Sequence, residues 1–167
     1  MKKRLLFMIN DMSVGGAEVG LVDVLNELTE EYDVDLLLLR KKGILIEKLN
    51  KKVNVISLCY ENSNPFNFIL NKIILLMYFS GGFFNKILYK MRLKAVYDAE
   101  IAYIEGYPAI FISNSPNKKS IKISSIRVGL LNHKLKAYKI PWGKHLLIKA
   151  YKKMDYNIHL SCFTLFT

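Results

Sequence analysis

The hydrophobic positions near the start of the chain change their spacing twice. Residues 3–9 form a continuous apolar run, which is typical of a strand buried on both faces of a parallel sheet. Residues 17–31 then have helical spacing, with one apolar face and one acidic face, and residues 32–39 give another strand. The first run and the helix are separated by a loop that ends in Gly15 and Gly16. This order predicts a βαβ unit.

The same alternation continues through the rest of the chain. The pattern predicts strands at 53–58, 98–104, 121–128 and 156–160, and helices at 43–50, 66–95 (broken at Gly81 and Gly82), 109–113 and 144–154. Strands that alternate with helices indicate the α/β class. We therefore expect one Rossmann-like domain over residues 1–167, with a mainly parallel sheet flanked by helices.

Composition agrees with a folded domain and excludes several other classes. Of the 167 residues, 51% are hydrophobic and 23% are charged, which is globular rather than disordered. The basic start and the apolar run to Ile9 are too short for a signal peptide and lack a small-residue cleavage site. Cys59 and Cys162 match no metal-binding spacing, so we expect two free thiols in a reducing compartment.

Charge is unevenly distributed along the chain. Residues 1–62 carry nine Lys and Arg against ten Asp and Glu, whereas residues 63–167 carry sixteen against four. A basic second half favours contact with an anionic partner, such as phospholipid, nucleic acid or a nucleotide phosphate. A lysine bias that merely keeps the surface solvated is the alternative.

The loop at residues 10–18 lies where α/β sheets bind ligands, beyond the carboxyl end of the first strand. Gly15 and Gly16 would let the backbone approach a ligand closely, and the following helix offers free N–H groups. Glu18 lies in the first helical turn, where the helix dipole favours a carboxylate, and Asp11 is a second nearby carboxylate. The loop lacks the spacing of a dinucleotide fingerprint or a P-loop, so the two glycines alone also fit a simple turn.

Longer stretches of the sequence carry a resemblance. The segment from Leu5 through Gly-Gly-Ala-Glu (residues 15–18) to Asn-Glu-Leu (residues 26–28) resembles the opening of family 4 glycosyltransferases, which have the GT-B fold. Residues 32–39, 97–108 and 152–161 resemble later strands of the same N-terminal domain. The Gly-Gly-Ala-Glu loop and the Tyr-Asp-Ala-Glu-Ile strand that starts at Tyr97 are the most specific pieces.

The resemblance implies transfer of a sugar from a nucleotide-sugar donor to a glycan or lipid-linked acceptor, as in polysaccharide assembly. It implies retention at the anomeric carbon, no metal and no cofactor beyond the donor substrate. The N-terminal half mostly binds the acceptor. Gly15 and Gly16 would face the donor phosphates, Glu105 would hydrogen-bond acceptor hydroxyls, and Gly106 would shape the adjoining turn. No residue is assigned a catalytic role.

Two departures from the family keep its activity an open question. Arg127 stands where the family has a histidine in the cleft, and arginine cannot act as a base near neutral pH. The family's donor site lies in a C-terminal domain, which would begin near Thr167, so we expect it on further sequence or on a partner chain. A non-catalytic binding subunit, or a truncated remnant, is the alternative to an enzyme.

The remaining candidate chemistry is sparse. His133, His145 and His159 have no zinc-binding spacing, and no nucleophile triad can be argued from the sequence. No helix-turn-helix, RNA-binding or zinc-finger signature accompanies the basic residues, so we expect no nucleic-acid partner.

The apolar stretch from residue 66 is interrupted too often to span a membrane. Farther on, Phe83 and Ile87 fall on an apolar helical face, and Lys86, Lys90 and Lys94 recur every four residues on another. This pattern is typical of a helix in an anionic membrane interface, and a core helix with a solvated lysine edge is the alternative. We expect a cytoplasmic protein, with these five residues as its contacts if it lies on the inner face of the membrane.

Overall fold

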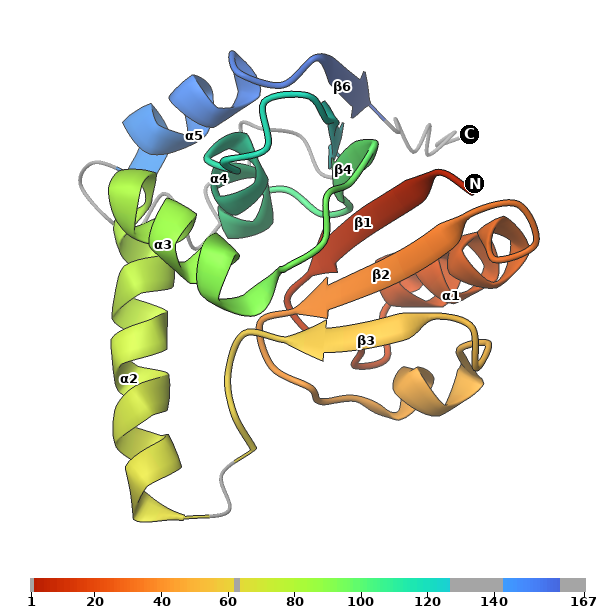
Figure 1. Cartoon of the computed structure of the whole chain (residues 1–167), viewed down its shortest axis with the longest axis horizontal. Coiled ribbons are helices and arrows are strands. Elements are labelled where there is room, and N and C mark those ends of the chain that lie inside the picture. Colours follow the sequence, from red (N-terminus) through yellow and green to blue (C-terminus); the bar gives the residue numbers. More distant parts are fainter. Residues whose placement is uncertain (1, 62–63, 127–142, 160–167) are drawn as a thin grey trace, which may run out of the picture.

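A computed structural model describes residues 2–61, 64–126 and 143–159 of the chain. Its centre is one six-stranded parallel sheet with the strand order β3-β2-β1-β4-β5-β6 (Figure 1). The strands are β1 (Arg4–Ile9), β2 (Asp33–Leu38), β3 (Asn54–Ser57), β4 (Ala99–Ala102), β5 (Ile121–Ile126) and β6 (Tyr156–His159). The predicted α/β, Rossmann-like parallel sheet is confirmed.

Helices cover both faces of this sheet. They are α1 (Gly16–Leu28), the 3-10 helix η1 (Ile44–Lys48), α2 (Pro65–Ser80), α3 (Gly82–Arg92), α4 (Tyr107–Ser113) and α5 (Gly143–Tyr151). Helices α1 and η1 pack on one face, and α2 to α5 contribute to the core on the other. The predicted elements agree with these bounds to within a few residues, and the expected break at Gly81 and Gly82 separates α2 from α3.

The alternation of side chains along β1 explains why the opening run of the sequence is apolar throughout. Leu6 and Met8 enter the core beneath α2 to α5, whereas Phe7 and Ile9 enter the core beneath α1. Neighbouring strand residues point to opposite faces, so a strand in the middle of a covered sheet has apolar residues at most of its positions. The interior position of β1, between β2 and β4, meets that condition.

One glycine outside the first loop is required by the fold. Gly43 has a φ of 113°, and a Cβ there would collide with the backbone of Met12. The Met12 N–H also donates to the Lys42 carbonyl at 2.8 Å, and the Leu45 N–H donates to the Met12 carbonyl at 3.3 Å. These contacts fasten the loop after β1 to the loop after β2.

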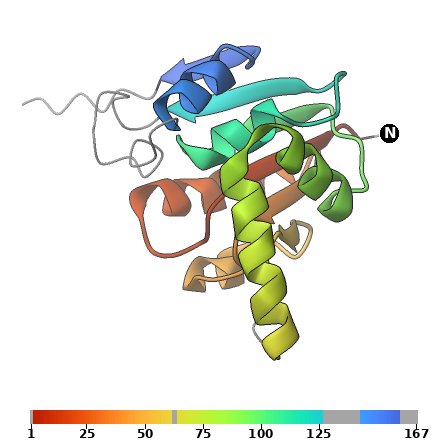
Figure 2. The same ribbon diagram turned by 90° about the vertical axis from the view of Figure 1, so that its left-hand side faces the viewer.

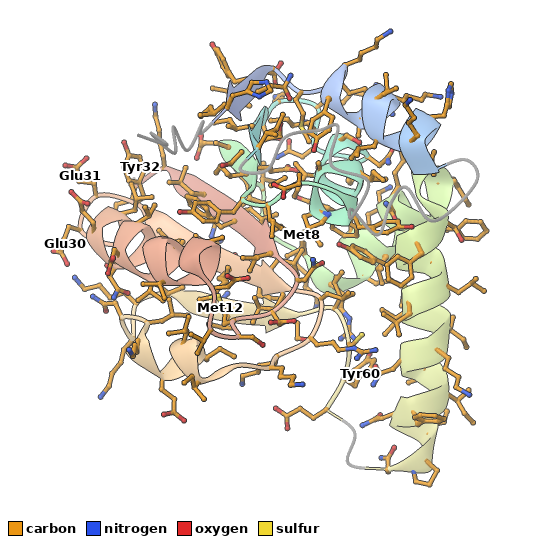
Figure 3. All side chains as sticks on the ribbon, turned by 180° about the vertical axis from the view of Figure 1, so that it is seen from behind. Met8, Met12, Glu30, Glu31, Tyr32 and Tyr60 are labelled. Atoms are coloured by element: carbon orange, nitrogen blue, oxygen red, sulfur yellow. The ribbon has the colours of Figure 1, made fainter. Side chains whose placement is uncertain are left out.

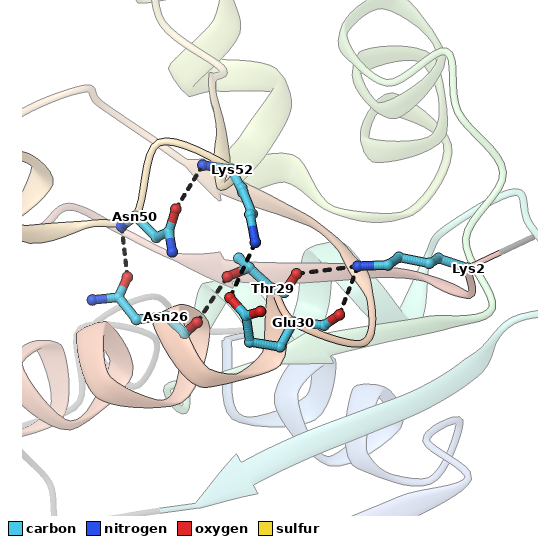
Figure 4. A network of polar contacts seen from close by, with 6 residues as sticks. All are labelled: Lys2, Asn26, Thr29, Glu30, Asn50 and Lys52. Atoms are coloured by element: carbon cyan, nitrogen blue, oxygen red, sulfur yellow. Dashed lines mark hydrogen bonds and ion pairs between the residues drawn. The ribbon is translucent and has the colours of Figure 1, made fainter.

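The amino-terminal edge of the sheet is closed by a polar network (Figure 4). The Asn50 N–H donates to Asn26 Oδ1 at 2.6 Å, and Lys52 forms an ion pair with Glu30 at 3.1 Å. Lys2 Nζ donates to the Glu30 carbonyl at 2.7 Å. The end of α1 is thereby held to the segment that enters β3.

Helices α2 and α3 cross that carboxyl edge. The arrowheads of β2 and β3 point toward α2, and the first turns of α2 extend beyond the body of the molecule (Figures 1 and 2). Asn64 caps α2 through a hydrogen bond of 2.7 Å from the Asn67 N–H to its side-chain oxygen, and Pro65 follows at the first helical position. Both features favour a helix start at this point.

Candidate functional site

The strand order has a switch point between β1 and β4. The chain passes from β1 outward to β2 and β3, and then returns to β4 on the other side of β1. In open α/β sheets, ligands bind in the crevice beyond the carboxyl ends of the strands at such a point. Gly15 and Gly16 follow β1, and Glu105 and Gly106 follow β4, so the sheet brings these two loops to the same edge at neighbouring strands.

The two glycines of the loop differ in the space beside them: it is free of described atoms at Gly16 and filled by a side chain at Gly15. A Cβ at Gly16 would meet no described atom within 4 Å, whereas a Cβ at Gly15 would meet the flexible Glu18 carboxylate. Gly15 has extended backbone that any residue can adopt, with φ of −158°. The opening at Gly16 is thus the feature of this loop that leaves room for a ligand near the start of α1. Asp11 instead accepts the Ser13 N–H at 3.0 Å and shapes the loop.

The corner after β4 is more restricted. Gly106 has a φ of 94° and forms the N-cap of α4, with Pro108 just inside the helix. Such a φ favours glycine, and proline is favoured at the first positions of a helix, which accounts for both residues at this corner. Glu105 is only 7% exposed, so its carboxylate lies inside the corner rather than on the surface of a turn.

The carboxyl-terminal end of α2 reaches this corner. Tyr78 lies 5.9 Å from Tyr107 and Phe79 lies 4.6 Å from Tyr107, measured between ring centroids. The Tyr78 hydroxyl also donates to Asn10 Oδ1 at 3.4 Å, which connects α2 to the end of β1. Burial raises the pKa of Tyr78 well above its ordinary value, so this hydroxyl stays protonated and remains a donor. Helix α2 is therefore a wall of the switch-point region.

A pocket of about 640 Å³ lies along the same edge, between α2 and the loops after β2 and β3. We call it the carboxyl-edge pocket. Figure 3 places Tyr60, one of its lining residues, beside α2 and at the opposite end of the sheet from the turn at Glu30 and Glu31. Its ionisable lining is mostly positive, because four cations accompany one carboxylate: Arg40, Lys41, Lys42, Lys72 and Glu61. An anionic or phosphorylated ligand fits that charge.

Two of the residues that line this pocket are Tyr60 and Cys59. The Arg92 guanidinium lies 3.8 Å from the centroid of the Tyr60 ring, a cation–π contact that holds the ring in place. Burial raises the pKa of the Cys59 thiol, although the nearby Arg40 opposes that shift. Cys59 is therefore a protonated, buried free thiol, as expected, whereas Cys162 lies outside the described residues.

No protein-family model and no curated protein sequence matches this chain.

The geometry of the site is therefore the evidence for what it binds. The structure brings together Gly15, Gly16, Glu105 and Gly106 at neighbouring strand ends. Arg127 and His133 lie outside the described residues. His145 and His159 are exposed on α5 and β6, and no group of three His, Cys, Asp or Glu side chains suited to a metal occurs within residues 2–61, 64–126 and 143–159.

The sequence analysis missed the carboxyl-edge pocket. Its basic wall after β2, residues 40–42, directly follows an apolar strand, and that order is the signal that could have located it. The contribution of α2 could not be found in this way, because an apolar helix has no sequence feature that specifies which strand ends it will cross.

Two buried carboxylates had no predicted role in the fold or in binding. Asp35 on β2 and Glu100 on β4 both lie beside Leu6 of β1, deep in the sheet. Glu100 Oε1 accepts three hydroxyls, from Tyr89, Ser115 and Ser120, at 2.8 to 3.0 Å. These bonds anchor helix α3 and the loop after α4 to the sheet. The glutamate of the Tyr-Asp-Ala-Glu-Ile motif therefore has a structural role.

The outer face of α2 is apolar. Four large side chains on it are exposed, and Leu76 is 70% exposed: Phe66, Ile69, Ile73 and Leu76. We call this set the apolar ridge. Among the described residues no helix combines the length and the apolar character that crossing a bilayer requires.

The five predicted membrane contacts differ in their exposure and in their position relative to α3. Phe83, Lys86 and Lys90 are exposed, and Ile87 is half-buried. Helix α3 ends at Arg92, so Lys94 is exposed beyond the helix rather than on its lysine edge. Leu88 and Tyr89 instead face the core, which means that α3 combines a buried face with an exposed apolar and basic face.

Proposed function

We propose that this chain is the acceptor-binding half of a retaining glycosyltransferase that moves a sugar from a nucleotide-sugar donor to a glycan or lipid-linked acceptor. The observation that carries the proposal is the placement of the glycine loop and Glu105 at neighbouring strand ends, at the switch point of a parallel sheet. This is where the resemblance expects donor phosphates and acceptor hydroxyls. A C-terminal domain or a partner chain would supply the nucleotide site.

The position of Glu105 supports a role in acceptor binding. It follows the carboxyl end of β4, where α/β sheets bind ligands, and a carboxylate accepts hydrogen bonds from sugar hydroxyls. The neighbouring carboxyl-edge pocket supports an acceptor that also carries negative charge. A lipid-linked phosphate or an acidic glycan has both properties.

Acceptor binding is testable on the chain itself. Saturation-transfer NMR with a panel of neutral glycans, acidic glycans and phosphorylated lipid-linked sugars should detect ligands of the last two classes. Glu105→Gln should weaken binding about tenfold, the loss of a charge-assisted hydrogen bond. Glu31→Gln, which removes an exposed carboxylate at the opposite edge, is the matched control and should have no effect. Equal binding by all three proteins would contradict the proposal.

Sugar transfer is the second readout. With labelled nucleotide sugars, we expect transfer to the acceptor only when a donor-binding Rossmann domain is present on the same polypeptide or as a partner. The alternative of a non-catalytic binding subunit is favoured by Arg127, which replaces the family's histidine. Acceptor binding without transfer in the assembled pair would select that alternative.

A peripheral contact with an anionic membrane fits a lipid-linked acceptor. The apolar ridge would enter the interface, and the chain between Glu61 and Asp98 contains no Asp or Glu that anionic lipid would repel. Leu76→Glu and Lys90→Glu should each reduce sedimentation with vesicles that contain phosphatidylglycerol. Ile44→Glu, at an exposed apolar position on η1, is the matched control. If neither Leu76→Glu nor Lys90→Glu reduces sedimentation with the vesicles, the contact with an anionic membrane is excluded.

A further inference from the structure

A second basic hollow lies between α3, α4 and α5, away from the carboxyl-edge pocket. It consists of two adjoining depressions of about 230 and 350 Å³, which share Lys86, Ser113 and Lys153 as lining residues. Helix α4 starts at the carboxyl edge and ends at Ser113, and the loop that follows it leads into the first residue of β5. The hollow therefore adjoins the amino-terminal side of the sheet.

Lysines dominate its lining. The lysines are Lys86, Lys118, Lys122, Lys149 and Lys153, whereas Asp155 is the one carboxylate among the described residues that line either depression. We call this set, with Ser113 and Asn114, the lysine pocket. Asp155 is already engaged, because its Oδ2 accepts the backbone N–H of Lys122 at 2.7 Å.

Three of these lysines, Lys86, Lys149 and Lys153, line the same depression. Lys153 Nζ donates to Asn114 Oδ1 at 3.1 Å, which directs it toward the end of α4. Lys122 Nζ donates to the Asn117 carbonyl at 2.7 Å and to Ser120 Oγ at 3.1 Å. Partial burial lowers the pKa of Lys153, and the charges of Lys149 and Lys86 lower it further. The folded chain thus concentrates like charge at this place, and a bound anion would relieve the repulsion.

We propose that the lysine pocket is a binding site for a phosphate group. A phosphate monoester carries up to two negative charges near neutral pH and accepts several hydrogen bonds, so it matches a depression lined by the three ammonium groups of Lys86, Lys149 and Lys153. The 230 Å³ depression also contacts the exposed ring of Phe83, which leaves space beside the phosphate for an apolar substituent. The phosphate can belong to a soluble metabolite or to a lipid headgroup.

Calorimetric titration of the whole chain with inorganic phosphate and with glycerol phosphate tests the site. Lys86→Gln and Lys153→Gln should each weaken binding about tenfold, because each removes a charged donor. Lys86→Arg should retain most of the affinity. Lys51→Gln, at an exposed lysine before β3 on another part of the surface, makes the same change in net charge and should leave binding unaltered. Both pocket lysines are exposed, so thermal unfolding should confirm that the variants stay folded.

Vesicles distinguish the two sources of phosphate. Those with phosphatidic acid present a phosphate monoester, and those with phosphatidylglycerol, at equal total charge, do not. Selective loss of phosphatidic acid binding in Lys153→Gln identifies a lipid headgroup, whereas loss confined to the soluble phosphates identifies a metabolite, and both results support the site. If Lys51→Gln weakens phosphate binding as much as the pocket variants, or if no variant weakens it, the proposal is overturned. None of these outcomes depends on Glu105 or on sugar transfer, so the glycosyltransferase proposal can fail while this one holds.

Discussion

Replacing Tyr97 with phenylalanine removes one buried hydrogen bond and little else. Tyr97 is 1% exposed, and its hydroxyl donates to Asp35 Oδ2 at 2.6 Å. The phenylalanine ring occupies the same space, so no cavity of methyl size opens. Asp35 keeps one hydrogen bond, from Asn54 Nδ2 at 3.1 Å, and a more distant ion pair with Arg4 at 3.8 Å.

The expected loss of stability follows from the charge and burial of the acceptor. A hydrogen bond to a charged group contributes about 1.5–3 kcal/mol, and the upper part of that range applies when the abandoned partner stays buried. Asp35 is buried, and Asn54 does not reach the oxygen that Tyr97 leaves. We therefore expect Tyr97→Phe to lower the free energy of unfolding by about 2 kcal/mol. For a chain of this size, that change lowers the melting temperature by roughly 4–8 °C.

Urea unfolding followed by circular dichroism measures the change. Tyr156→Phe is the matched control because Tyr156 is 61% exposed, and its effect should stay within about 0.5 kcal/mol. A double-mutant cycle with Asp35→Asn should give a coupling energy of about 1 kcal/mol or more between the two side chains. If Tyr97→Phe is no more destabilising than Tyr156→Phe, the buried hydrogen bond does not stabilise the sheet in the way described.

Three further predictions concern the fold. Gly43→Ala should lower the free energy of unfolding by more than about 2 kcal/mol in urea titrations, because it combines a positive φ with a collision against the Met12 backbone. A free energy of unfolding within about 0.5 kcal/mol of the parent would contradict that geometry. Burial raises the pKa of Tyr89 and Tyr97 above the ordinary 10.0, so both stay neutral in the folded chain while the unfolded chain ionises. Stability should therefore be fully present below pH 10 and fall above it, and Tyr89→Phe should flatten the fall by up to about 1.4 kcal/mol per pH unit. Asn64→Ala should lower stability by about 1 kcal/mol through loss of the α2 cap, whereas Asn64→Ser should restore most of it.

Local pattern was enough to predict the elements and the class of the fold. Strands with apolar residues at successive positions, such as β1, are expected only where both faces of a sheet are covered, and the helical spacing of residues 17–31 gave α1. The prediction that the glycine loop and Glu105 share an edge followed from parallel pairing alone. It required no knowledge of the side-chain contacts.

The pockets could not be predicted, because they depend on where helices α2 to α5 lie over the sheet. Residues 66–79 are so apolar that the sequence cannot separate the buried Ile74 and Tyr78 from the exposed Ile73 and Leu76. The lysine pocket joins residues 67 positions apart, from Lys86 to Lys153, and no local period relates them.

The positions of α2 and α3 show where the basic residues of the second half of the chain are concentrated. The 36 residues between Glu61 and Asp98 contain five Lys and Arg and no acidic residue, and they build one wall of each basic hollow. Lys72 faces the carboxyl-edge pocket and Lys86 faces the lysine pocket, so a single acid-free helical pair gives both hollows the same sign of potential. A surface kept basic only for solubility would have no reason to concentrate its lysines in concave sites, where mutual repulsion is strongest. Partial burial, followed by the charges of Lys149 and Lys86, lowers the pKa of Lys153, which agrees with a concentration of like charge at the lysine pocket.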